Sequence, residues 1–133
     1  MKTFNVRTSA RSQFVNIDGE VSAALQALGA GDGVAVVYCP HTTAGITINE
    51  NADPDVPRDM IEKLGRLAPR DESFYRHGEG NSDSHVRSSL VGCSETVIVR
   101  GGRPVMGTWQ SIFFAEFDGP RTRQVHVDFV ASA

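Results

Sequence analysis

Three of the four histidines fall within one third of the chain, together with most of the acids that would act with them. His41, His77 and His85 lie between residues 41 and 85 of the 133, and so do nine of the sixteen acidic residues. Zinc accepts three histidines with an open fourth position, and magnesium prefers carboxylates, waters and phosphate oxygens. The histidines lack the close spacing of a His-Glu-x-x-His motif. Their types therefore allow a divalent metal site, and equally allow ordinary surface or hydrogen-bonded histidines.

The polar residues of this region gather where predicted strands end and predicted helices begin. Such loops commonly carry binding sites, and the glycines beside Glu79 let the backbone approach a ligand closely. Asp53 and Asn81 also suit helix caps, a role that needs no ligand. The candidate groups are His41, Thr42 and Thr43; Asn49, Glu50 and Asp53; and His77, Glu79, Asn81 and His85.

Four further residues have a chemical and a structural interpretation. Trp109, the only tryptophan, is expected to be a core or subunit-interface aromatic, because tryptophan contributes a large packing area. Gln110 needs a partner if its amide turns inward, and Arg87 is one of several arginines able to bind phosphate. Cys39 is expected in the core and is not expected to be a catalytic thiol.

The elements that must position these residues alternate at short spacing. Helical spacing predicts a helix that begins at Asp18 as N-cap, one between Pro54 and Pro69, and one over 82–91. The continuous apolar run 34–39 predicts a central strand covered on both faces. Together with the alternating segments, this indicates about seven strands and three helices, an α+β fold that is mainly an antiparallel β-sandwich. The other predicted strands are 2–8, 13–17, 46–49, 96–99, 108–117 and 124–131.

Composition bounds the class of protein. The length suits a single domain over residues 1–133. The net charge of −3 and the absence of a basic stripe argue against nucleic acid as the main partner. No apolar run approaches the roughly 18 residues of a membrane span, and the N-terminus lacks the apolar stretch of a signal peptide. We therefore expect no membrane partner and a cytoplasmic location.

The motifs of this chain resemble those of the YjbQ-like family in order and spacing over almost the whole length. Departures are small: Phe117-Asp118 stands where many members have an arginine after the glutamate, and residues 103–106 replace a more usual Arg-Leu-x-Leu. The matching segments are HTTAGITINEN (41–51), DPDV (53–56), DM (59–60), His77, EGN (79–81), His85, SSLVG (88–92), GTWQ (107–110) and E-x-x-GPR (116–121).

The resemblance implies a small α+β sandwich that forms a homotrimer with sites near subunit boundaries. It also implies a secondary thiamine-phosphate synthase activity, in which an aminopyrimidine diphosphate is joined to a thiazole phosphate and diphosphate is released. The partners would be small phosphorylated heterocycles. Members are thought to bind a metal through histidines, which here are His41, His77 and His85, and the metal would be Zn or Mg.

On this hypothesis catalysis must neutralise charge on the departing diphosphate. The catalytic candidates are Glu50, Asp53, Glu79 and Asn81. The substrate-binding candidates are Thr42, Thr43, Asn49, Arg87, Trp109 and Gln110. Two alternatives stay open: a zinc-dependent hydrolase with Glu50 or Glu79 as base, and a non-catalytic trimer that binds a metal or a phosphorylated ligand.

Overall fold

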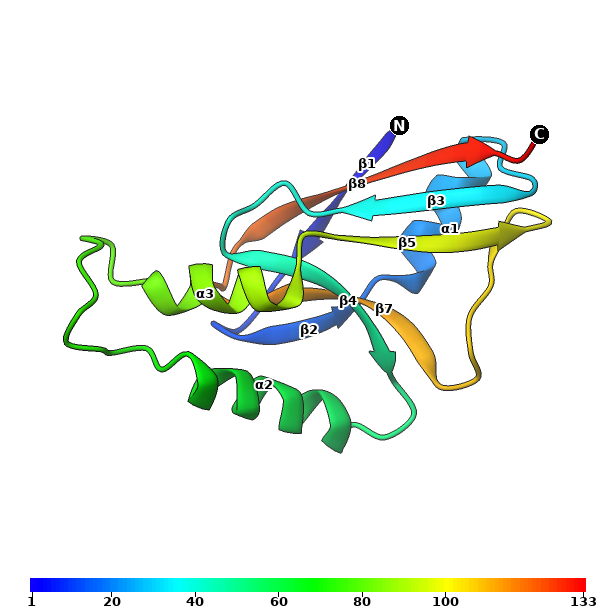
Figure 1. Ribbon diagram of the computed structural model, residues 1–133. Helices are drawn as coiled ribbons and strands as arrows, with labels where there is room; N and C mark the ends of the chain where they lie inside the picture. Colours follow the sequence, from blue (N-terminus) through cyan, green and yellow to red (C-terminus); the bar gives the residue numbers. More distant parts are fainter.

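Two antiparallel sheets form the framework of the protein (Figure 1). The computed structural model describes residues 1–133 and contains eight strands and three helices. One sheet consists, in spatial order, of β1 (Lys2–Arg7), β8 (Thr122–Ala131), β3 (Gly33–Tyr38), β5 (Ser94–Arg100) and β6 (Arg103–Pro104). The other consists of β2 (Gln13–Asn16), β7 (Gln110–Glu116) and β4 (Ala44–Glu50). The predicted α+β class is confirmed, and the additional strand is the two-residue β6.

The core lies between the two sheets and is closed by α1 (Asp18–Ala27). Period-2 alternation turns Val37 of β3 inward from one sheet, and Ile46 and Phe114 inward from the other. The α1 residues Val21 and Leu25 lie one helical turn apart and are both fully buried against this cluster. The sequence therefore folds as a sandwich in which α1 covers part of the interior.

The start of α1 differs from the prediction. Asp18 is the first helical residue and not its cap, and no side chain caps this helix. The carboxylate of Asp18 instead accepts a hydrogen bond of 2.7 Å from the backbone N–H of Ile112 in β7. An acid in the first turn still faces the positive end of the helix dipole, so the same residue serves the helix and joins it to the sheet.

The other two helices lie on the three-stranded sheet, on the side away from the five-stranded one (Figure 1). These are α2 (Asp55–Leu67) and α3 (Ser82–Val91), and both agree with the predicted ranges. Two serines attach α3 to the sandwich: Ser88 donates to the carbonyl of Ala44, and Ser84 donates to that of Phe117. The N-terminal part of α3 is thereby fixed beside the end of β7, and its C-terminal half beside the start of β4. No helix is long and apolar enough to cross a membrane.

The central strand β3 is covered on only one face, which makes the prediction of two covered faces wrong within one chain. Its residues alternate strictly between buried and exposed, and Val36 is 38% exposed. Val34 of β3 lies between Ile98 of β5 and Val130 of β8 in the sheet register, and both partners are exposed. We call this surface the outer-sheet patch; it comprises Val34, Val36, Tyr38, Ile98 and Val130.

Candidate functional site

All three predicted histidines line one pocket, of about 440 Å³, which we call the histidine pocket. It lies where the loop before β4, the loop before α3 and the start of β8 meet. Apart from Pro40, all the side chains around it are polar or charged. The rings of His77 and His85 lie edge to face, with centroids 5.5 Å apart. The lining residues are Pro40, His41, Thr42, Thr43, His77, Glu79, Asn81, His85, Asp118, Arg121 and Arg123.

Apart from Arg87, the remaining candidates lie at the opposite end of β4, and we call them the Trp109 group. Glu50 pairs with Gln110 in the sheet register, and the N–H of Asn51 donates to the carbonyl of Trp109. Seven strand residues at about 3.3 Å each separate the two ends of β4 by roughly 20 Å. Within one chain, therefore, these residues do not join the histidine pocket. The Trp109 group comprises Asn49, Glu50, Asp53, Trp109 and Gln110.

Three side chains of the Trp109 group have local roles or none. Trp109 is 62% exposed, so it is not a core residue. Asp53 Oδ1 accepts a hydrogen bond from the N–H of Asp55 at the start of α2, as expected of an acid at a helix start. Gln110 is exposed, and its amide oxygen accepts from the N–H of Gly107.

A buried ion pair joins Glu116 to Arg123, which lines the histidine pocket. Glu116 is fully buried, and its carboxylate accepts hydrogen bonds from Arg123 Nε at 2.9 Å and from the hydroxyl of Thr8. Arg123 also donates to the hydroxyl of Thr43, two residues after His41. Sequence reasoning missed this pair. The available signal was an acid inside the apolar run of β7, since a buried charge must be paired.

His41 is held by the backbone of β8. Its Nε2 lies 2.9 Å from the backbone nitrogen of Gln124, which donates to it. Burial and the nearby charge of Arg123 lower the pKa of His41 below its ordinary value. Both effects disfavour a positive charge on the ring, so the neutral imidazole is the form that this loop holds.

The loop before α3 brings Glu79, Asn81 and Asp118 together. Asn81 is 6% exposed, and its Nδ2 donates to Asp118 at 2.8 Å and lies 3.5 Å from a Glu79 oxygen. Its Oδ1 is buried without a partner. Asn81 precedes α3 as its N-cap residue, but its side chain makes no capping hydrogen bond. Its amide is therefore used to position carboxylates.

Arg87, a substrate-binding candidate, points into the protein and not into the pocket. It donates twice to the carbonyl of Ala68 and lies 3.1 Å from Asp83. Asp83 is also bonded by Arg11. Burial raises the pKa of Asp83, but the hydrogen bond from Arg11 and the charges of both arginines outweigh it and leave the pKa lowered. Arg87 thus fixes the end of α2 against α3.

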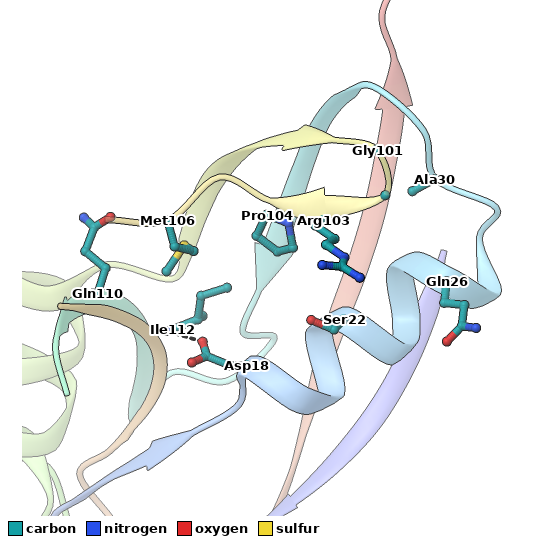
Figure 2. Close-up of a pocket in the computed structure, with 11 residues that line it drawn as sticks. Asp18, Ser22, Gln26, Ala30, Gly101, Arg103, Pro104, Met106, Gln110 and Ile112 are labelled. Atoms are coloured by element: carbon teal, nitrogen blue, oxygen red, sulfur yellow. Dashed lines mark hydrogen bonds between the residues drawn. The ribbon is translucent and has the colours of Figure 1, made fainter. Parts of the chain in front are cut away.

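A second, larger cavity of about 690 Å³ lies between α1, the β5–β6 turn and the start of β7 (Figure 2). Gln110 is its only residue among the candidates. Figure 2 shows Asp18 directed to Ile112, its hydrogen-bond partner. Because this cavity contains none of the histidines and only one candidate residue, we assign the candidate site to the histidine pocket despite its smaller volume.

Comparison with known proteins identifies the family. The family model described as UPF0047 protein YjbQ-like matches residues 2–132. The chain belongs to the YjbQ-like family. It is 51% identical to the UPF0047 protein YugU of Bacillus subtilis over 127 residues, 96% of each chain. It is 52% identical to a UPF0047 protein of Methanocaldococcus jannaschii, over 96% of this chain and 91% of that one.

Solved structures of YjbQ-like proteins share the fold. A YjbQ/UPF0047 family protein from Clostridium acetobutylicum superposes with a TM-score of 0.94 at 48% identity, covering 98% of this chain and all of that one. A conserved hypothetical protein from Thermus thermophilus gives 0.91 at 42% identity, with 98% and 100% covered. These relatives are named for a family or as hypothetical proteins and not for a reaction, so function must be argued from the site.

The side chains of the histidine pocket of this YjbQ-like protein fit magnesium better than zinc. No group of three or more His, Cys, Asp and Glu side chains is arranged to hold a metal, and Nε2 of His41 is taken by Gln124. A three-histidine zinc cage therefore does not fit this arrangement. Magnesium is commonly held by one or two carboxylates together with substrate phosphates, and Glu79 and Asp118 suit that mode.

Proposed function

We propose that this protein is a transferase of the secondary thiamine-phosphate synthase type, acting in the histidine pocket. It joins an aminopyrimidine diphosphate to a thiazole phosphate and releases diphosphate. The observation that supports this is the lining, in which every side chain except that of Pro40 is polar or charged. Ligand pockets are usually mostly apolar with few polar groups. A pocket lined almost entirely by polar side chains favours substrates that are recognised mainly through their phosphate groups.

The proposed reaction does not need a strong general base. The bond between the pyrimidine methylene carbon and the diphosphate oxygen breaks, and the electron pair leaves with diphosphate. The ring stabilises the resulting cation, and the thiazole nitrogen supplies the pair for the new carbon–nitrogen bond. The protein must hold both partners and stabilise charge on the leaving group. Polar donors around the pocket suit that task.

The charges of the pocket make the proposal dependent on magnesium. Arg121 is paired with Asp118 at 3.0 Å, and Arg123 with Glu116. No arginine of the pocket is then free of an acid, and Glu79 adds a further carboxylate. A bare diphosphate would be repelled, whereas Mg²⁺ would neutralise part of its charge and so reduce the repulsion. Mg²⁺ held by Glu79 and Asp118 would neutralise the leaving diphosphate.

The proposal extends to a homotrimer in which the site is shared. The outer-sheet patch exposes apolar side chains from three adjacent strands, and such patches mark interaction surfaces. A three-fold ring has heterologous interfaces, in which one surface of a subunit meets a different surface of its neighbour. We therefore propose that the Trp109 group of one subunit completes the histidine pocket of the next, with Trp109 against a heterocycle.

The test is product formation by metal-defined protein. Purified protein is incubated with the pyrimidine diphosphate, the thiazole phosphate and Mg²⁺, and thiamine phosphate is followed by chromatography. His41→Ala, checked for the same assembly state, is the pocket variant, and His126→Ala is the matched control outside the pocket. Product from the wild type and control but not from His41→Ala supports the proposal.

Two other results would count against it. No product from any of the three proteins would refute the synthase activity. Release of diphosphate without the thiazole substrate would favour a hydrolase in the same pocket.

A further inference from the structure

The tautomer of His41 follows from its hydrogen bond to the backbone. A peptide N–H only donates, so the Gln124 N–H requires a lone pair on His41 Nε2, 2.9 Å away. A neutral imidazole with a lone pair on Nε2 carries its proton on Nδ1. Turning the ring over would set a ring C–H against the Gln124 N–H. The geometry therefore selects both the ring orientation and the tautomer.

The local sequence explains why this bond exists. The β3–β8 ladder ends with the pair Tyr38 and His126, and Gln124 lies two residues before His126 in β8, beyond the end of the ladder. The strand that would satisfy its N–H is ended by Pro40. The imidazole of His41 takes the place of the missing carbonyl acceptor. The ring is thus an extension of the sheet and not a free side chain of the loop.

The loop on the far side of His41 is equally fixed. The carbonyl of Thr43 accepts the N–H of Phe117 and a bond from Arg123. On the near side, the N–H of Cys39 donates to the carbonyl of Cys93 at 2.7 Å. Backbone anchors on both sides leave His41 little freedom to turn away from Gln124.

We propose that His41 is a fixed hydrogen-bond donor, with its proton on Nδ1, and not a metal ligand. A ring whose Nε2 accepts from the backbone and whose Nδ1 carries a proton has no lone pair for a metal. Nδ1 has no hydrogen-bond partner within the chain, although His41 lines the pocket. The Nδ1–H of His41 would donate to a phosphate oxygen, and this assignment of the acceptor rests on the proposed function. The assignment of the tautomer does not rest on the proposed function.

The tautomer is read from a long-range ¹H–¹⁵N spectrum of wild-type protein labelled on histidine nitrogens, at neutral pH. His41→Asn assigns the signals, and His126, bonded through Nδ1 to the hydroxyl of Thr3, is an internal reference outside the pocket. We expect a protonated Nδ1 and an unprotonated Nε2 for His41, unchanged on adding Zn²⁺. A protonated Nε2, or a Zn²⁺-induced shift of either His41 nitrogen to a metal-bound value, would overturn the proposal.

The donor role is measured separately by calorimetry with inorganic diphosphate and Mg²⁺. One hydrogen bond to a charged group corresponds to about a 10- to 100-fold change in affinity. We expect His41→Ala to lose that much, and His126→Ala to lose nothing. Equal affinity of wild type and His41→Ala would refute the donor role. No binding by wild type would refute the donor role and the diphosphate site of the proposed function together, and the spectrum would still decide the tautomer.

Discussion

Replacing Glu116 with Gln should destabilise the protein by about 3–5 kcal/mol, the cost of removing one partner of a buried ion pair. The substitution keeps the shape of the side chain but removes its charge. Arg123, which is 2% exposed, then stays buried without a counter-charge. The carboxylate also accepts hydrogen bonds from Thr8 and from the N–H groups of Phe117 and Asp118. A glutamine amide has only one acceptor oxygen, and its NH₂ group cannot accept, so some of these donors would lose their partner.

Urea unfolding followed by circular dichroism measures the loss. A domain of this kind has a total stability of about 5–15 kcal/mol, so the unfolding midpoint should fall by a large fraction. Glu62→Gln removes an exposed ion pair with Arg66 and should cost under about 1 kcal/mol. The double variant Glu116→Leu/Arg123→Met should recover stability, because it removes both charges. A loss below about 1 kcal/mol for Glu116→Gln would refute the reasoning.

Three further outcomes follow from the structure. The pKa of Asp83 is lowered from its ordinary value of 3.8 in the folded protein. Its ionised carboxylate therefore stabilises the fold above about pH 4, and this stabilisation is lost as the pH falls toward the pKa of the folded state. Urea midpoints should drop more steeply below about pH 4 in wild type than in Asp83→Asn. Burial raises the pKa of the Cys39 thiol to about 11, whereas Cys93 is exposed; mass spectrometry after iodoacetamide at pH 8 should find only Cys93 modified in native protein, and both in urea. Val36→Lys places a charge in the outer-sheet patch and should convert a trimer to monomers in light scattering, and an unchanged mass would place the subunit contact elsewhere.

The sequence predicts the helices well because their signals are local. The limits of α3 follow from Asn81 before it and Gly92 after it. Its apolar spacing is misleading, because Val86 and Leu90 are exposed and the buried face is polar. The cover of the strand over 34–39 is harder to predict, because an uninterrupted apolar run indicates only that both faces of the strand are shielded from water. It does not tell whether the second cover comes from the same chain or from a neighbour. Val36 is exposed here because nothing in its own chain covers that face.

The site is harder to predict than the fold because it depends on register between distant segments. The types of His41, His77 and His85 indicate chemistry, but only the packing of α3 on β4 brings them to one pocket. An arginine such as Arg87 could bind a phosphate, but its ion pair with Asp83, one helical turn earlier, holds the side chain in the interior. Glu116 ends β7 and Arg123, seven residues later, lies at the start of β8, so their pairing depends on the turn between the two strands.

The separation of the Trp109 group from the histidine pocket leads to a test of shared sites. If each site takes its pocket from one subunit and Trp109 from the next, His41→Ala and Trp109→Ala should each be inactive as pure trimers. A randomly mixed trimer would contain intact sites wherever a Trp109→Ala subunit supplies the pocket and a His41→Ala subunit supplies the tryptophan. With equal amounts each condition is met half the time, so about one quarter of the wild-type activity should return. Unfolding and refolding the two variants together, against each refolded alone, measures this. No recovery in mixed trimers of confirmed composition would mean that Trp109 does not complete a neighbour's pocket, and that the polar residues around His41 act within one chain.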